Sequence, residues 1–232
     1  MNTADEVKRA LVVGAHPDDP DFGAGGTAAL WSQDGWEFYY LVCTDGSKGS
    51  SDPTMTPAQL VPLRREEQRA AARVLGVKEC FFLDHVDGEL MPSRQLLGEI
   101  VRVIRLIRPY AVFTHTLDVI HRNAFINHRD HRVTAEATID AVYPAARDVH
   151  NFPEHLAEGL SPHHVRELYL WGAKESNFEV DITPVVDLKL RALLEHRSQF
   201  GHREDFMQFA RERWRDESGR YLERFQRVVL AR

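Results

Sequence analysis

The stretch ALVVGAHPDDPDFGAGGTAALW, residues 10–31, decides the fold of this chain and locates its chemistry. Its apolar start at 10–15 is typical of a buried strand, and its Ala-rich continuation from Gly26 to Gln33 is typical of a helix. A strand that leads through a polar turn into a helix predicts an α/β fold. The turn itself carries one histidine and three aspartates: His16, Asp18, Asp19 and Asp21.

The rest of the chain repeats this alternation. Further strand-like runs occur at 37–43, 80–84, 110–115 and 167–171. A helical pattern ends at Gly76, and another begins after Ser93, a suitable N-cap, and stops at Pro109. We therefore expect one α/β domain over residues 1–232, a Rossmann-like three-layer sandwich with a mainly parallel sheet. In such folds the active site lies at the C-terminal ends of the strands.

Composition narrows the class of protein. With 43% hydrophobic and 28% charged residues, the 232-residue chain resembles an ordinary globular protein. Its net charge of −6 argues against nucleic-acid binding, and it lacks the run of roughly 18 apolar residues that a membrane span needs. The polar start MNTADEVKRA is not a signal peptide, so we expect a cytoplasmic protein. Cys43 and Cys80 are expected to be core thiols without a disulfide, and a homo-oligomer is left open.

Four polar loops follow the predicted strands: HPDD at 16–19, TDGSKGS at 44–50, DHVDGEL at 84–90 and the His-rich segment 115–131. Because the strands are expected to be parallel, these loops should meet at one edge of the sheet. Loops that a rigid scaffold positions in this way commonly carry function.

The HPDD turn has the residue types of a catalytic zinc site. Such a site needs three protein ligands, drawn from His, Asp, Glu and Cys, and one open position. Adjacent side chains diverge, so one of Asp18 and Asp19 is expected to bind the metal while the other reaches the attacking water. Capping of the following helix would need only one acid and no His16, although Asp21 is equally consistent with that role.

A third ligand is expected from NHRDH, residues 127–131. His128 and His131 are three positions apart, so they share a face if the turn is helical. Asp130 is suited to orient a histidine by accepting its ring N–H. His115 and His121 are competing candidates for the ligand.

Together these motifs resemble the LmbE/PIG-L family of zinc-dependent de-N-acetylases, which includes deacetylases of mycothiol, bacillithiol and glycopeptide-antibiotic biosynthesis. The resemblance is carried by AHPDDPDFGAGGTAA at 15–29 and NHRDHRV at 127–133. LRREEQRAAARVLGV, FLDHVDGEL and DITPVVDLKLRALLEHRSQF resemble family segments in the same order. Arg129 stands where the family usually has Pro, and Asp21 where Glu is common; neither position is a ligand.

The resemblance implies a role for each site residue. His16, Asp19 and His131 would bind one Zn²⁺ per chain, with Asp18 as general base. His128 would stabilise the oxyanion, with Asp130 behind it.

Two weaker assignments also follow from the resemblance. Arg64 would face a polar or anionic part of the substrate, although Arg64 and Glu67 equally suit a solvated helix face. Asp87 would bind sugar hydroxyls, against the alternative of a turn-forming residue.

The expected activity is Zn²⁺-dependent hydrolysis of an N-acyl amide, acetyl by the resemblance, on a small amino-sugar conjugate, giving free amine and acetate. A metal-dependent phosphoesterase is an alternative, but it normally needs ligands for two metals. A non-catalytic metal- or sugar-binding protein is another, but it would be expected to lack Asp18 or His128.

The C-terminal segment leaves two questions open. A helix with Phe206, Phe209, Ala210 and Trp214 on one face would pack on the core, or else form a subunit interface or a cavity wall. His196, Ser198 and Gln199 match a family segment, but the sequence assigns them no role.

Overall fold

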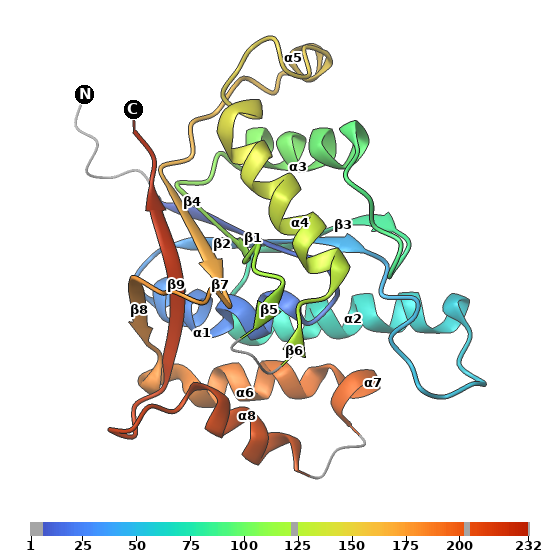
Figure 1. The fold of residues 1–232 in the computed structure, drawn as a ribbon, viewed down its shortest axis with the longest axis vertical. Coiled ribbons are helices and arrows are strands. Elements are labelled where there is room, and N and C mark those ends of the chain that lie inside the picture. Colours follow the sequence, from blue (N-terminus) through green and yellow to red (C-terminus); the bar gives the residue numbers. More distant parts are fainter. Residues whose placement is uncertain (1–6, 122–124, 202–204, 232) are drawn as a thin grey trace.

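A seven-stranded sheet forms the centre of the computed structural model, which describes residues 7–121, 125–201 and 205–231 (Figure 1). In sheet order its strands are β3 (Glu79–His85), β2 (Glu37–Thr44), β1 (Arg9–Gly14), β4 (Ala111–His115), β7 (Glu167–Trp171), β9 (Leu222–Val229) and β8 (Phe178–Asp181). The first five are parallel to one another, and β9 is antiparallel to both of its neighbours. The expected α/β fold with a mainly parallel sheet is confirmed.

The strand order reverses beside β1. From β1 the chain passes through α1 (Asp19–Gln33) to β2 and through α2 (Pro57–Leu75) to β3, on one side of β1. It then crosses back through α3 (Arg94–Ile107) to β4, on the other side. Such a reversal opens a crevice at the C-terminal ends of the two diverging strands, which is where α/β proteins bind ligands.

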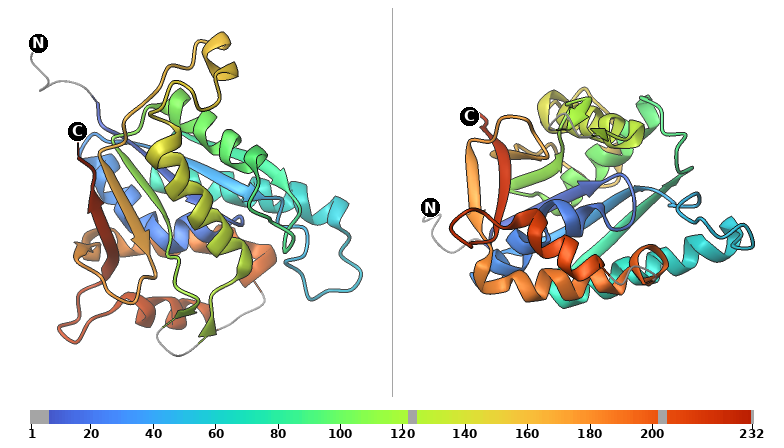
Figure 2. Two further views of the ribbon diagram at one scale, coloured as in Figure 1. Left: turned by 45° about the horizontal axis from the view of Figure 1, so that its top comes forward. Right: turned by 60° about the horizontal axis from the view of Figure 1, so that its bottom comes forward.

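Helices cover both faces of the sheet, which gives three layers (Figure 2). On β1, Leu11 and Val13 face a core shared with α3, α4 (Arg129–Asp140) and η1 (Ala141–Ala145). Ala10 and Val12 face the opposite core, formed with α1 and α2. This alternation follows from the two-residue period of a strand, and burial on both faces explains why β1 is apolar from Ala10 to Gly14. A further helix, α6 (Val186–Glu195), packs on α1 and α2.

Local signals predict the ends of α2 and α3 correctly. Gly76, with φ of 79°, ends α2, and the Ser93 side chain caps α3 by accepting the Leu96 amide at 3.1 Å. The start of α1 lies earlier than the predicted Gly26, because the helix already begins at Asp19. Glycines are therefore inside α1, and a Cβ on Gly26 would lie 2.7 Å from the Ile182 side chain. Close packing of the helix explains their presence there.

The C-terminal segment differs from the expectation in two ways. The helix α8 (Phe206–Trp214) buries Phe206, Ala210 and Trp214, but Phe209 is 45% exposed. Beyond α8 the chain forms β9, which inserts between β7 and β8. Neither β8 nor β9 is predicted from the sequence, because polar and charged residues interrupt the apolar ones in both strands, which are partly exposed.

Short elements complete the described chain. They are β5 (Ile120–His121), β6 (Phe125–Ile126), α5 (Glu154–Ala157), η2 (Thr183–Val185) and α7 (Arg197–Phe200). Cys43 is buried, Cys80 is half-buried, and neither forms a disulfide, as expected. Among the described residues, no helix combines the length and apolarity needed to cross a membrane.

Candidate active site

The four polar loops meet at the C-terminal edge of the sheet. Backbone contacts join them: the Asp45 amide donates to the His85 carbonyl at 2.8 Å, and the Asp87 amide donates to the Asp45 carboxylate at 3.1 Å. The Gly88 amide donates to the Asp130 carboxylate at 2.7 Å. The loops after β2 and β3 are thus tied to each other and to the start of α4.

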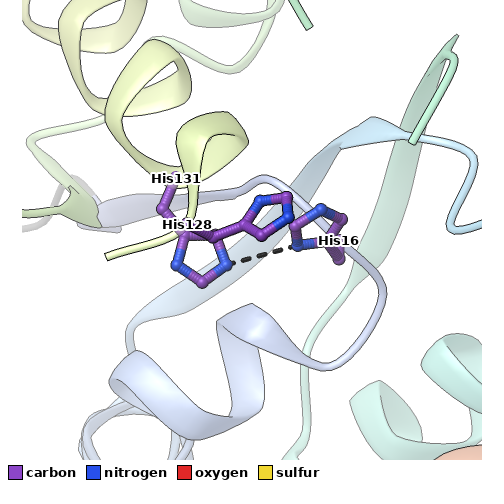
Figure 3. Close-up of side chains that lie close together, drawn as sticks. All are labelled: His16, His128 and His131. Carbon is purple, nitrogen blue, oxygen red and sulfur yellow. Dashed lines mark hydrogen bonds between the residues drawn. The ribbon is translucent and has the colours of Figure 1, made fainter. Parts of the chain in front are cut away.

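His16 from the HPDD turn lies beside His128 and His131 at the start of α4 (Figure 3), and Asp19 contacts His16 and His131. His16 Nδ1 lies 3.2 Å from His131 Nε2 and 3.3 Å from an oxygen of Asp19. The other oxygen of Asp19 lies 3.2 Å from His131 Nε2. Four-coordinate zinc with ligand distances of about 2.0–2.1 Å separates its ligand atoms by about 3.3 Å. The spacing therefore fits one metal ion held by His16, Asp19 and His131.

The remaining ring nitrogens support the same conclusion. His16 Nε2 lies 3.2 Å from the Asp130 carboxylate, and His131 Nδ1 lies 3.1 Å from the side-chain oxygen of Asn127. Oxygens in both positions place the ring protons on these outer nitrogens, which leaves lone pairs on the two nitrogens that face each other. Sequence reasoning missed Asn127, whose only signal is its place directly before His128.

The carboxylates around His16 make the site favourable for positive charge. Burial alone would lower its pKa, but contacts with Asp130, Asp19 and Asp87 raise the pKa well above its ordinary value. Burial would raise the pKa of Asp19, yet His131 and His115 hold it well below its usual range. A cluster of ionised carboxylates around two imidazoles is an environment that a divalent cation neutralises.

His115 contacts the cluster, and with Asp19 and His131 it forms a second group of side chains close enough to hold a metal ion. Its Nδ1 accepts from the indole of Trp171 at 3.1 Å. Its Nε2 lies 3.3 Å from Asp19 and faces the Ala15 amide, also at 3.3 Å. Burial lowers the pKa of His115 to about 3, which keeps the ring neutral. The competing candidate His121 has its side chain outside the described part of the structure.

Asp18 lies beside the cluster in an unusual backbone conformation, with φ of 106° and ψ of −32°. Burial raises the pKa of Asp18, and the nearby guanidinium of Arg64 opposes that shift. Arg64 Nη2 lies 3.2 Å from the Asp18 carboxylate and donates to the Pro17 carbonyl at 2.7 Å. Arg64 is 3% exposed, so the alternative of a solvated helix face is wrong for this residue.

Two other acids prove to be buried. Glu67 accepts from the amide and the hydroxyl of Ser198, at 2.8 and 2.6 Å. A solvated role is therefore wrong for Glu67 too. Asp21 is fully buried and accepts from Gln68 and His196, both at 2.8 Å, so it does not act as a helix cap.

The structure changes the expected partner of His128. The Asp130 carboxylate contacts His16 and the Gly88 amide, whereas the Asp130 backbone N–H donates to His128 Nδ1 at 3.2 Å. His128 is thereby the N-cap of α4, and burial together with His16 lowers its pKa. The expectation that the Asp130 carboxylate accepts the ring N–H of His128 is wrong.

Asp87 lies on the β3 side of the cluster. Its carboxylate is 3.2 Å from His16 Nε2 and accepts from the Lys48 amide at 3.1 Å. It is buried, and its pKa is lowered: burial alone would raise the pKa, but His16 outweighs it.

A cavity of about 370 Å³ opens beside the cluster on the β7 side. Asp19, His115 and His131 lie at its inner end. Its walls include the aromatic residues Phe22, Trp171, Phe209 and Trp214, together with Arg213, Leu222, Glu223 and Arg224. The C-terminal α8 and β9 therefore form a cavity wall, one of the alternatives considered for this segment.

The chain is similar in sequence and structure to several known proteins, most of them named as deacetylases. Residues 11–142 match the sequence profile of the family described as GlcNAc-PI de-N-acetylase, PIG-L. A diacetylchitobiose deacetylase from Thermococcus kodakarensis is 36% identical over 195 residues, which cover 84% of this chain and 71% of that protein. The solved structure of N,N′-diacetylchitobiose deacetylase from Pyrococcus horikoshii is 31% identical, with a TM-score of 0.86 over 97% of this chain and 85% of that one. A 4-oxalmesaconate hydratase from Pseudomonas putida is 35% identical over 122 residues, half of this chain and 46% of that protein.

Proposed function

The chain belongs to the GlcNAc-PI de-N-acetylase (PIG-L) family, and we propose that it is a zinc-dependent hydrolase that removes the N-acetyl group from a small amino-sugar conjugate. The products are a free amine and acetate. The observation that carries the proposal is the convergence of His16 Nδ1, His131 Nε2 and the two Asp19 carboxylate oxygens, with neighbouring atoms 3.2–3.3 Å apart, beside the largely buried carboxylate of Asp18.

His16, Asp19 and His131 would hold one zinc ion per chain. When bound, zinc supplies a Lewis acid that polarises the amide carbonyl and lowers the pKa of a water molecule. Asp130 and Asn127 orient the two imidazoles, and His115 orients Asp19.

Asp18 acts as the general base. A carboxylate next to the ligand set can take a proton from the attacking water and pass it to the leaving amine. Burial raises its pKa, which strengthens it as a base, while Arg64 favours the ionised form that the reaction requires.

His128 donates a hydrogen bond to the carbonyl oxygen as negative charge develops there. Its Nδ1 accepts from the Asp130 amide, so the proton of the neutral ring is on Nε2. A neutral His128 can therefore serve as the donor, and its lowered pKa is compatible with that role. The charged imidazolium that pairing with the Asp130 carboxylate would have favoured is not required.

The substrate would contact residues on two sides of His16, Asp19 and His131. Asp87 lies on one side, where its carboxylate suits sugar hydroxyls, and the cavity of about 370 Å³ lies on the other. Trp171, Phe209 and Trp214 line that cavity, and aromatic faces suit the apolar faces of sugar rings. Because α8 and β9 supply this wall, we propose that residues 1–232 act as one deacetylase domain. Substrate contact by Arg64 stays a prediction, since its described contacts are to the protein itself.

The test is amine release from N,N′-diacetylchitobiose and N-acetylglucosamine by the metal-loaded protein, with the Asp18→Asn variant as control. Asp18→Asn keeps the size of the side chain and should keep the metal, but it should lower kcat by roughly 10²–10⁴-fold. Near wild-type turnover in this variant would move the base role to another residue. Absence of amine release from every N-acetylated sugar offered would remove the proposal.

A hydratase is the second candidate, because one relative is named as 4-oxalmesaconate hydratase. A base beside a metal can also activate water for addition to a double bond. Following 4-oxalmesaconate consumption in the same preparation separates the two reactions, since hydration releases no amine. Loss of a phosphate ester in a parallel assay would instead support the phosphoesterase alternative.

A further inference from the structure

The backbone of Asp18 needs an explanation of its own. A residue with a Cβ at φ of 106° lies outside the favoured regions, and such a conformation is strained. The conformation persists only if surrounding contacts hold it. The partners of the Asp18 main chain therefore determine where the proposed base lies.

Gln68 holds the amide of Asp18. The Asp18 N–H donates to the Gln68 side-chain oxygen at 2.8 Å, and Gln68 is fully buried on α2. The other end of the Gln68 amide donates to the Asp21 carboxylate at 2.8 Å. Because a carboxylate only accepts hydrogen bonds, Asp21 determines which end of the Gln68 amide faces Asp18.

His196 holds Asp21. Its Nε2 donates to the same Asp21 oxygen at 2.8 Å, and both side chains are fully buried. His196 lies between α6 and α7, far from Asp21 in the sequence, so the contact joins the C-terminal part of the chain to the start of α1.

The segment that carries His196 is itself held in place. The Ser198 backbone amide donates to Glu67 on α2 at 2.8 Å, and the Gln199 side chain donates to the Gly49 carbonyl at 2.9 Å, in the loop after β2. This anchoring limits the movement of His196 relative to α2, where Gln68 lies.

We propose that His196 is a positioning residue for Asp18, acting through Asp21 and Gln68. The inference rests on the proposed function in that Asp18 is the general base. The chain of hydrogen bonds from His196 to the Asp18 amide keeps Gln68 in one orientation and so keeps the strained backbone of the base in place. This assigns a role to the His196–Gln199 segment, for which the sequence alone provides none.

Three variants test the proposal. His196→Phe fills the site but removes the donor, whereas His196→Gln keeps an N–H donor at the same number of bonds from Cα. Ser198→Ala is the matched control, because it removes only the hydroxyl contacts to Glu67 and Gln199, keeps the Ser198 amide bond that anchors the segment, and does not touch the path to Asp18. His196→Phe should lower kcat by about 10–100-fold, as misplacement of a reacting group does, with KM and metal content unchanged. His196→Gln should recover most of the loss, and Ser198→Ala should keep wild-type kcat.

The same substitution in an Asp18→Asn background separates positioning from a general structural role. If His196 acts through Asp18, His196→Phe should not lower the residual kcat of Asp18→Asn any further. An equal fold-loss in both backgrounds would overturn the proposal. If His196→Phe does not fold, Gln68→Met breaks the same path at its other end and should meet the same criteria.

Hydrogen exchange of the Asp18 amide provides a measurement that needs no activity. In protein labelled with ¹⁵N-aspartate, the Asp18 amide should exchange faster in His196→Phe than in wild type, and at the wild-type rate in Ser198→Ala. Unchanged protection in His196→Phe would overturn the proposal. Faster exchange in a protein without deacetylase activity would leave the positioning intact and reject only the proposed function.

Discussion

Replacing Arg64 by methionine should destabilise the fold and also raise the pKa of Asp18, the proposed general base. The guanidinium donates to the Gly46 carbonyl at 3.0 Å and to the Pro17 carbonyl at 2.7 Å, and it lies 3.2 Å from the Asp18 carboxylate. Methionine retains most of the side-chain volume, so the loss is mainly of these contacts. Two buried carbonyls and a largely buried carboxylate would lose their donors. We expect the free energy of unfolding to fall by about 3–5 kcal/mol.

The same substitution should shift the pH dependence of catalysis. Burial raises the pKa of Asp18 and Arg64 opposes that shift, so removing Arg64 raises the pKa of Asp18 further. A general base must be deprotonated, so activity falls as the pH falls through its pKa. The acidic limb of kcat/KM should therefore move to higher pH in Arg64→Met. Arg64→Lys keeps the charge but cannot reach all three acceptors, so its shift should be smaller.

Urea unfolding at pH 7 and kcat/KM profiles with N,N′-diacetylchitobiose measure the two effects of Arg64→Met. A decrease in the free energy of unfolding below about 1 kcal/mol, with an unmoved acidic limb, would refute this account of Arg64. Loss of buried hydrogen bonds must cost more than a typical surface substitution. A normal profile with weaker binding only of charged conjugates would instead support the substrate contact that the family resemblance implies.

Other parts of the structure yield further expectations. Asp19→Ala should lower the metal content from about one ion per chain, measured by elemental analysis, and full retention would make Asp18 the candidate ligand. Lys189→Met leaves the buried Glu223 carboxylate without its ion-pair partner, so urea unfolding should show a loss of about 3–5 kcal/mol. Glu223 also accepts hydrogen bonds from α1. Lys189→Met combined with Glu223→Gln leaves no unpaired carboxylate, so its loss of stability should be less than the sum of the two single losses. Strict additivity would contradict coupling of the pair. Burial lowers the pKa of His163 from 6.5 to about 4, so the folded state favours the neutral ring. The free energy of unfolding therefore falls as the pH falls from 6.5 towards 4, where the unfolded state binds the proton more readily. From pH 7 to pH 5, wild type should therefore lose about 1 kcal/mol more than His163→Gln, after allowance for partial exposure, and parallel losses would disprove the linkage.

Much of the candidate site is predictable because its signals are local. The apolar run before His16 identifies the strand, and the parallel-sheet rule then places every polar loop at the same edge. Ser93 and Gly76 act within one helical turn, so the ends of α3 and α2 follow from neighbouring residues alone. His16, Asp19 and His131 come together at that edge, since His16 follows β1, Asp19 begins α1 and His131 lies in the first turn of α4.

Which side chains contact one another is harder to predict than where each lies in the fold. The motif places Asp130 close to both His128 and His16, but only the packed loops show that its carboxylate contacts His16. A separation of only two positions in the sequence favours His128, whereas the Gly88 amide from the loop after β3 draws the carboxylate towards His16. Sequence distance was a poor guide because that loop contributes to the choice.

By itself, the sequence determined the alternation of strands and helices, the edge of the sheet that carries the candidate site, and the histidines and aspartates that meet there. Tertiary structure alone decided which charged residues are buried. On α2, Arg64 and Glu67 have the pattern of a solvated face until α6, α7 and two loops cover that face. Asp21 and His196 contact each other although 175 positions separate them. Hydrophobic periodicity records only the environment that neighbouring residues create, whereas the burial of a polar side chain depends on a distant segment that brings it a partner.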